Sequence, residues 1–461
     1  MARSDRPAVS KSSAINRIVL LFVVLCIGVG LGYFLHSRQI VPYRVVNSVK
    51  QLLNPASVNQ SPPGQWNLME SDHPTVGLSS DQVAEMEKLL SLGYAGGTIP
   101  RPKDTGVTIF DEELTAHGLC FFTSGHAPEA LLMTRDGDVL HQWHYDYRDV
   151  WAADKEFFMK PKKDGKTDCW RRAHLFPNGD ILAIYEGHGL IKLDKNSQLL
   201  WSYAGKCHHD LFVTDEGNIW VLTREVGVVP RIHESKPVLL DFFVLLSPEG
   251  KPIRKIPFLE AFENSAYASF LDKAPAAGDI FHTNTLEPLD GSLAHKSPLF
   301  ARGNILTSVR EINTIAILDP RQEKIVWALS GMWIKQHQPT LLANGNILLF
   351  DNLGHGGRSK VVEIDPFTQE IVWAYEDGPE HSLYSKTCGS TERLPNGNTL
   401  IIESDNGRVL EVTPERLIVW EYRNPHRAGK DRELIAAILD LIVLPEDFPL
   451  DWIPAAEDSE S

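Results

Sequence analysis

Residues 394–422, LPNGNTLIIESDNGRVLEVTPERLIVWEY, contain the pattern that is most informative about the fold. It holds an Asn-Gly-Asn turn and three short runs rich in Ile, Val and Leu, the last of which contains Trp420. Short apolar runs bounded by turn residues are typical of β-strands. Asn-Gly suits a two-residue hairpin turn, since both central positions can take φ > 0. The stretch therefore predicts a small sheet of consecutive strands.

The same unit occurs five more times upstream, and the repeat sets the architecture. Its copies cover residues 135–143, 176–203, 214–256, 301–329 and 342–375. Its turn glycines are Gly137, Gly179, Gly217, Gly303, Gly345 and Gly397. A period of about 50 residues fits a four-stranded propeller blade with loops. We predict an all-β fold, a six-bladed β-propeller over residues 120–425. A β-sandwich is the weaker alternative, because it requires no repeated unit.

A tryptophan recurs at one place in the repeat. The four examples are Trp201, Trp327, Trp373 and Trp420. Large aromatic side chains at equivalent positions are best explained by packing between adjacent sheets. We expect these residues to lie between blades and to take no part in ligand binding.

An uncharged run, IVLLFVVLCIGVGLGYFL at 18–35, lies near the N-terminus. Eighteen helical residues just span the hydrocarbon core of a bilayer, so we predict a transmembrane helix that anchors the chain. Basic residues are denser before the run than after it, which places residues 1–17 in the cytoplasm and the rest on the periplasmic or extracytoplasmic side. A cleaved signal peptide is the main alternative, but its apolar region is usually shorter.

Two further segments flank the predicted propeller. Residues 36–119 read as a Pro/Ser-rich stalk followed by a helical leader, with a helix over 79–92. Residues 426–461 read as a helix over 431–443 followed by an acidic tail. The expected fold therefore carries short helical additions at both ends.

The charge balance excludes one class of partner. The chain has 45 Lys and Arg against 60 Asp and Glu, a formal net charge of −15. Neutralising phosphates needs a basic face, so nucleic acid is not an expected partner. An anionic substrate would have to be captured by local positive groups, among which we count Arg171 and Arg310.

The repeat also identifies candidate site residues, because the first strand of each propeller blade lines the central channel. Eight residues before the turn glycine stand Arg171, His209 and His337. His282 opens the fourth copy in the same way. Three histidines at the starts of inner strands are hard to assign to packing.

Arg310 lies seven residues after its turn glycine, where we expect the second strand of the fourth blade. A guanidinium there needs a buried partner or an anionic ligand, since it cannot lose its charge. The structural alternative is a salt bridge to Glu287 or Glu311. With Asn284, the histidines and Arg310 admit three interpretations: a metal site, nucleophilic catalysis, or histidines satisfied within the fold.

At these residues the sequence resembles the bacterial arylsulfate sulfotransferases, which move a sulfuryl group between phenols without a nucleotide donor. The resemblance covers roughly residues 120–425. It lies in the repeat and in four motifs: HHD at 208–210, HxN at 282–284, SxR at 308–310 and QHxP at 336–339.

The resemblance implies a chemistry for each motif. It places the nucleophile, which becomes a sulfohistidine, on His337. It puts sulfate binding and proton transfer on His209, His282, Asn284 and Arg310, and it makes Ser390 a candidate for substrate binding. It implies an aryl sulfate donor, a phenolic acceptor, and neither cofactor nor metal.

Two other function classes stay open. Propellers are frequent interaction platforms, so an anchored non-enzymatic scaffold is one alternative. A quinone-dependent propeller dehydrogenase is the other, although its channel would carry calcium-binding carboxylates. The oligomeric state is not fixed by the sequence, and a homodimer stays an open alternative.

Overall fold

The computed structural model describes residues 65–67, 81–82, 92–95, 97, 99–100, 102–151, 169–376, 383–429 and 431–453. The described residues belong to one compact unit, residues 63–461. The predicted cytoplasmic tail and the predicted anchor at 18–35 lie outside them, as does the acidic tail beyond 453. Among the described residues, no helix has the length and apolar character needed to cross a membrane.

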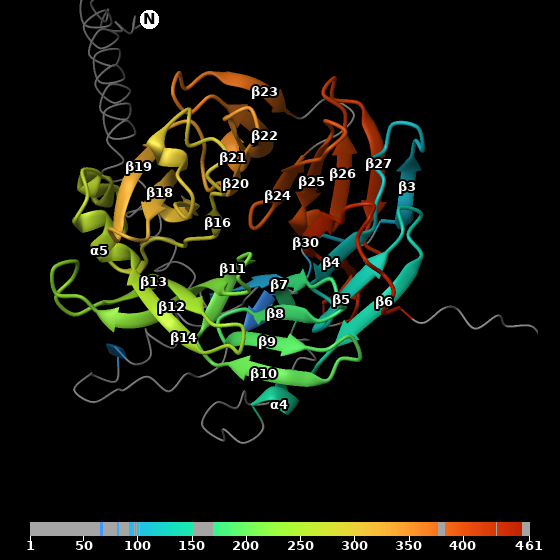
Figure 1. Cartoon of the computed structure of the whole chain (residues 1–461), viewed down its shortest axis with the longest axis horizontal. Helices are drawn as coiled ribbons and strands as arrows, with labels where there is room; N and C mark the ends of the chain where they lie inside the picture. The colour runs from blue at the N-terminus through green and yellow to red at the C-terminus, as the bar shows by residue number, and fades with distance from the viewer. Residues whose placement is uncertain are drawn as a thin grey trace, which may run out of the picture. The chain divides into compact units, whose positions relative to one another are not determined.

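Six sheets, each with four antiparallel blade strands, form a ring, and in blades 2 to 6 the first strand lies toward the centre (Figure 1). The strands of blade 2 are β7 (Trp170–Leu175), β8 (Ile181–Tyr185), β9 (Gly189–Leu193) and β10 (Leu199–Tyr203). Those of blade 3 are β11 (Cys207–Val213), β12 (Ile219–Val228), β13 (Pro237–Leu246) and β14 (Pro252–Pro257). Those of blade 4 are β16 (Glu287–Pro288), β17 (Ile305–Val309), β18 (Thr314–Asp319) and β19 (Lys324–Ser330). Those of blade 5 are β20 (His337–Leu341), β21 (Ile347–His355), β22 (Arg358–Ile364) and β23 (Ile371–Tyr375). Those of blade 6 are β24 (Ser390–Arg393), β25 (Thr399–Glu403), β26 (Arg408–Val412) and β27 (Ile418–Arg423). The six-bladed β-propeller predicted from the repeat is confirmed.

Blade 1 closes the ring with strands from both ends of the described chain. It consists of β4 (Cys120–Ser124), β5 (Glu129–Met133), β6 (Val139–His144) and β30 (Ile438–Val443). β30 is the innermost strand and pairs antiparallel with β4. A fifth strand, β3 (Gly106–Phe110), joins the outer edge of blade 6 beside β27. The propeller therefore extends beyond residues 120–425 in both directions.

The predicted C-terminal helix over 431–443 is wrong, because most of this segment is strand. Its spacing of apolar residues resembles a helix, but β4 has backbone groups facing the centre of the ring that need partners. Residues 438–443 supply those partners as β30. Tertiary context thus overrides the local pattern.

The turn glycines all have positive φ, from 80° at Gly217 to 96° at Gly137. The turns are longer than the predicted two residues, however. In blade 2 the Gly179 N–H donates to the Phe176 carbonyl (2.9 Å) and the Phe176 N–H donates to the Asp180 carbonyl (2.8 Å). Among the central residues only the glycine has positive φ, which fits a type I turn followed by a left-handed glycine.

Two copies of the repeat depart from the common pattern. Gly137 lies in the turn between β5 and β6, the outer strands of blade 1, and not between its first two strands. In blade 4 an insertion separates β16 from β17, which accounts for the longer interval between His282 and Gly303.

Small elements decorate the ring. The helices are α4 (Tyr147–Val150), α5 (Phe258–Glu263), η2 (Ala268–Lys273), η3 (Pro298–Phe300), η4 (Arg310–Ile312) and η5 (Ser404–Asn406). The remaining strands are β1 (Gln65–Asn67), β2 (Leu92–Ala95), β15 (Gly278–Asp279), β28 (Arg427–Ala428) and β29 (Leu434–Ile435). Of the predicted leader helix over 79–92, residues 81 and 82 are helical, Leu92 begins β2, and the rest lies outside the described residues.

The hydrophobic core is divided among the interfaces between blades. Six clusters of buried side chains each combine residues of two neighbouring blades. The repeated tryptophans lie in or against these clusters, and three of them donate an indole N–H to a turn carbonyl of the next blade. The pairs are Trp201 with Pro248 (3.1 Å), Trp373 with Pro414 (2.9 Å) and Trp420 with Arg135 (2.8 Å). Their predicted role in packing is confirmed.

Candidate active site at the centre of the ring

The first strands of blades 2, 3 and 5 are irregular at the positions that the repeat singled out. Their pairing shifts register at Arg171, His209 and just after His337, respectively. Such β-bulges bend a strand and redirect a side chain. His209 (φ 54°), His282 (φ 52°) and Gln338 (φ 47°) also have left-handed backbones, which are uncommon for residues with a side chain. Backbone strain of this kind concentrates at functional sites.

His337 is held through one nitrogen. Its Nδ1 lies 2.7 Å from Asn352 Oδ1 and 3.1 Å from the Lys335 carbonyl. The Asn352 amide donates to the carbonyls of Ser385 (2.8 Å) and Cys388 (2.7 Å), which fixes its oxygen toward the histidine. Because both partners of Nδ1 are acceptors, Nδ1 carries the proton and Nε2 carries the lone pair.

The second nitrogen of His337 is buried, and among the described residues it has no hydrogen-bond partner. Buried polar atoms are normally satisfied, so an unsatisfied one calls for an explanation. Burial lowers the pKa of His337 well below its ordinary value, and the charges of Arg310, His282 and Arg171 lower it further. The hydrogen bond that His337 donates to Asn352 opposes this shift without cancelling it. At neutral pH the ring is therefore an uncharged base with an available lone pair.

His209 and His282 meet across blades 3 and 4. Their Nε2 atoms are 3.2 Å apart, and their rings lie edge to face at 4.8 Å. His282 Nδ1 lies 2.5 Å from Asp279 Oδ2. Although burial alone would raise the pKa of Asp279, the charge and hydrogen bond of His282 lower it to about 2. Asp279 is therefore a carboxylate that accepts the Nδ1 proton of His282.

His208 extends this series of imidazoles beyond His209. His208 Nδ1 lies 2.8 Å from His209 Nδ1. Burial lowers the pKa of both rings well below the ordinary value, and the charge of His282 adds to the effect. Three histidines and a carboxylate thus form one hydrogen-bonded series, with each ring in reach of the next.

A carboxylate of blade 2 supports His209. Glu186 Oε2 accepts the backbone N–H of His209 at 2.9 Å, and Oε1 lies 3.6 Å from Arg224 Nη2. The ligand atoms of Glu186, His208 and His209 lie within 4.8 Å of one another, so the metal interpretation has a candidate site here. A cation at this place would compete with the Arg224 guanidinium and with the hydrogen bonds of the imidazole series.

Arg310 lies at the start of η4 and not within a strand, which corrects the sequence prediction. Its Nη1 donates to Glu311 Oε1 at 2.5 Å, and Lys335 Nζ donates to the other oxygen of Glu311 at 2.6 Å. The salt bridge expected as the alternative to ligand binding is therefore present. Two cations share this single carboxylate, so net positive charge stays beside His337.

The other predicted residues have distinct surroundings. Asn284 Nδ2 donates to the Gln336 carbonyl at 3.0 Å, and its Oδ1 accepts from Thr285 at 3.0 Å. Asn284 thus holds the residue before His337 across the boundary between blades 4 and 5. Arg171 is buried and donates to the Leu439 carbonyl of β30 at 2.8 Å. Ser390 is buried at the start of β24.

Sequence reasoning missed the residues that orient the histidines, above all Asn352 and Asp279. A usable signal existed for Asn352, since it lies seven residues after its turn glycine, as Glu186 does. In blade 6 the same position holds Ser404, whose Oγ accepts the N–H of Gly389 at 3.0 Å. At or just after the end of the second strand, this position therefore repeatedly holds a polar side chain that binds a residue at or near the start of a first strand, in its own blade for Asn352 and Ser404 and in the next blade for Glu186.

Comparison with protein families identifies the family of the chain. Residues 172–425, more than half of the chain, match the arylsulfotransferase (ASST) family, and the chain belongs to that family. The match spans the motifs around His209, His282, Arg310 and His337. Among curated proteins, none matches the chain significantly.

Solved structures with related architecture are distant. One is a protein of unknown function from Bacteroides caccae, at 12% identity and a TM-score of 0.45, covering 71% of this chain and 98% of that one. A streptogramin B lyase is 15% identical with a TM-score of 0.40, covering 75% of this chain and 95% of that one. The Dos1 propeller is 9% identical with a TM-score of 0.38, covering 70% of this chain and 77% of that one. These scores carry no information about activity.

Proposed function

We propose that this chain transfers the sulfuryl group of an aryl sulfate to a phenol, with His337 as the covalent carrier. The observation that carries the proposal is the buried lone pair of His337 Nε2, which has no hydrogen-bond partner among the described residues. Membership of the arylsulfotransferase family supports the reaction class. A scaffold protein would have no use for a neutral imidazole held in this tautomer.

In the first half-reaction the Nε2 lone pair attacks the sulfur of the donor. The N–S bond forms as the S–O bond to the aryl group breaks, and the electron pair of that bond leaves on the phenolate. The ring becomes positively charged while it keeps its Nδ1 proton. Asn352 Oδ1 and the Lys335 carbonyl accept hydrogen bonds from this Nδ1–H and so stabilise the charge.

The departing phenolate needs a proton. His282 is suited to supply it, because its side chain is 16% exposed whereas that of His209 is 1% exposed. The Asp279 carboxylate behind His282 stabilises the protonated ring before the transfer. In the second half-reaction the acceptor phenol gives its proton to His282 while its oxygen attacks the sulfur. The new O–S bond forms as the N–S bond breaks, and the electron pair of the N–S bond returns to Nε2 of His337.

The transferring group is anionic, and positive side chains surround its place. Transfer of a related phosphoryl group has a loose transition state, in which the protein mainly aligns the reactants and stabilises the oxygens. Arg310 and Arg171 both lower the pKa of His337 through their charge, so their field reaches the reacting nitrogen. We propose that the sulfate oxygens lie in the field of these two guanidinium groups. Asn284 positions His337, because its amide donates to the carbonyl of the preceding residue, Gln336.

The anchor remains part of the proposal. Residues 18–35 contain no charge, which supports a membrane anchor with the propeller outside the cytoplasm. Protease treatment of intact spheroplasts should then digest the propeller. Protection of the propeller until the membrane is lysed would contradict this topology.

Residues 40–461 should transfer sulfate from p-nitrophenyl sulfate to phenol without added nucleotide. His337→Asn should abolish transfer and leave the circular dichroism spectrum unchanged. The matched control is His295→Asn, since His295 is exposed in the blade 4 insertion. Full activity of His337→Asn would refute the nucleophile assignment.

A further inference from the structure

Glu311 places a negative charge beside the positive groups near His337. Its Oε1 accepts a hydrogen bond from Arg310 Nη1 at 2.5 Å, and its Oε2 accepts one from Lys335 Nζ at 2.6 Å. The exposed fractions of these side chains are 18% for Glu311, 15% for Arg310 and 26% for Lys335. The carboxylate and both of its cationic partners therefore lie where solvent, and a dissolved anion, can reach them.

The backbone around Glu311 is held without this carboxylate. The Glu311 N–H donates to the Phe281 carbonyl at 2.9 Å, and the Arg310 N–H donates to the His282 carbonyl at 3.4 Å. Both acceptors belong to the segment that leads to β16 in the same blade. The first two residues of η4 are thus fixed through their main chain.

Blade 5 also fastens the loop that contains η4. Gln336 is fully buried, and its Nε2 donates to the carbonyls of Val309 at 3.3 Å and Thr314 at 2.9 Å, which lie before and after η4. Asn313 Oδ1 accepts the backbone N–H of Lys335 at 2.9 Å. Neutral hydrogen bonds therefore hold η4 on both sides, so the salt bridge of Glu311 is not needed to keep the helix in place.

An anionic ligand and the Glu311 carboxylate need the same donors. The guanidinium group carries five N–H donors in a fork that matches carboxylates and tetrahedral oxyanions such as phosphate. Within the part of the chain that the structure describes, Glu311 is the only hydrogen-bond acceptor for the Arg310 side chain. A sulfate at Arg310 must displace this carboxylate or lie beside it against like-charge repulsion. In both cases the carboxylate weakens sulfate binding.

We propose that Glu311 is a specificity-determining residue, whose carboxylate pairs with Arg310 and Lys335 and so competes with anionic ligands. This inference rests on the proposed function and adds that simple inorganic anions are disfavoured at the site. An aryl sulfate offsets the competition through its ring, because burial of apolar surface favours binding. Inorganic sulfate has no apolar surface, so it is a weak ligand and a weak inhibitor.

Binding of inorganic sulfate by the full-length protein tests this role without relying on turnover. Glu311→Gln keeps the shape of the side chain and removes its charge. We expect calorimetry to give a sulfate dissociation constant at least about threefold lower than that of the native sequence, which is the size of effect of a partly exposed charge pair. The gain should shrink as the ionic strength is raised, since salt screens such charges. Adding Arg310→Gln to the variant should abolish the gain.

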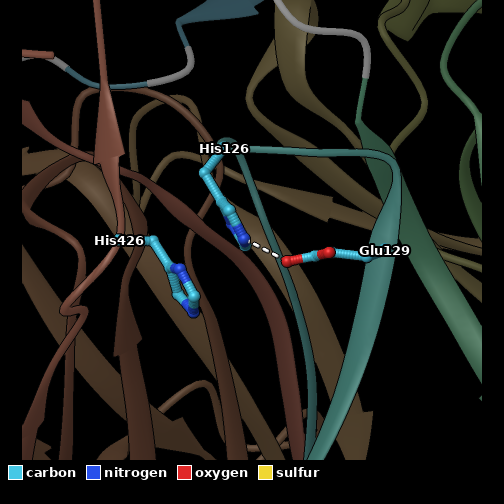
Figure 2. A group of neighbouring side chains, drawn as sticks. All are labelled: His126, Glu129 and His426. Atoms are coloured by element: carbon cyan, nitrogen blue, oxygen red, sulfur yellow. Dashed lines mark hydrogen bonds and ion pairs between the residues drawn. The ribbon is translucent and has the colours of Figure 1, made fainter. Parts of the chain in front are cut away.

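The matched control is Glu129→Gln, which makes the same change of charge in blade 1, across the ring from blade 4 (Figure 1). Glu129 also has a basic partner, since His126 Nε2 contacts its Oε1 (Figure 2). The His126 ring is stacked in turn on His426, with centroids 3.7 Å apart. Circular dichroism establishes that each variant is folded, and Glu129→Gln should bind sulfate as the native sequence does.

Three results would overturn the proposal. Sulfate binding that is unchanged or weaker in Glu311→Gln would mean that the carboxylate serves to position Arg310. Equal tightening in Glu129→Gln would trace the effect to net charge. Absence of sulfate binding by both the native and the Glu311→Gln proteins would mean that Arg310 is no anion site. Transfer from p-nitrophenyl sulfate is measured separately, so tighter sulfate binding without any transfer would refute only the proposed function.

Discussion

Replacing Asn352 with alanine should slow formation of the sulfohistidine more than it weakens donor binding. The change removes the 2.7 Å hydrogen bond to His337 Nδ1, the nitrogen that carries the proton. A hydrogen bond to a group that becomes charged is worth about 1.5–3 kcal/mol. At about 1.4 kcal/mol per factor of ten, its loss would slow the step roughly 10- to 150-fold. The Lys335 carbonyl remains at 3.1 Å, so we expect a reduction of about 10- to 50-fold.

The same substitution has a cost in stability that the assay must separate from catalysis. The Cys388 carbonyl loses the Asn352 amide donor, whereas the Ser385 carbonyl keeps the Ser359 hydroxyl at 3.2 Å. An orphaned buried acceptor costs about 1–3 kcal/mol. Rates are therefore compared at a temperature at which circular dichroism shows both proteins folded.

The measurement is the pre-steady-state burst of p-nitrophenol, with donor in excess of the protein and over a range of donor concentrations. Asn346→Ala is the matched control. Asn346 lies in the turn between β20 and β21, at the other end of the same blade, and its amide donates to Glu363. We expect the control to keep its burst rate. An unchanged burst rate in Asn352→Ala would refute the argument that this amide sets the reactive tautomer.

Two further predictions follow from the same structure. Attack requires neutral His337, and the pKa of His337 lies well below the ordinary value. The rate of the p-nitrophenol burst should therefore decline toward acid pH with a midpoint below about 6.5. A midpoint above this value would contradict the burial argument. Removing residues 434–461 deletes β29 and β30 and leaves the inner edge of β4 unpaired. Thermal unfolding of the truncated protein, followed by circular dichroism, should then show no cooperative transition. A truncated protein that melts like the full-length protein would show that β30 does not close the ring.

The repeat made the architecture and part of the site predictable. Its turn glycine acts as a fixed reference, and eight residues before it the sequence locates His209 and His337 at the starts of inner strands. The tryptophans of the outer strands were equally readable, because packing between identical sheets imposes the same side chain at the same place. These features repeat because each blade solves one packing problem.

Features that depend on distant parts of the chain could not be read in this way. β30 pairs with β4, which lies more than 300 residues upstream, so its local pattern gave no sign of a strand. The position of Arg310 depends on where β17 ends, which is a boundary that local pattern sets poorly. Asp279 lies in β15, a two-residue strand outside the repeat, and only the folded chain brings it to His282.

In the proposed reaction His337 Nε2 carries the sulfuryl group between donor and acceptor. Its most direct test is to mix residues 40–461 with an aryl sulfate donor, without acceptor, and to measure the mass of the intact protein at short times. We expect one added sulfuryl group per chain, mapped to the peptide with His337 and removed when phenol is added. Steady turnover with the protein mass unchanged throughout would mean direct transfer between the two phenols and would rule out His337 as the carrier.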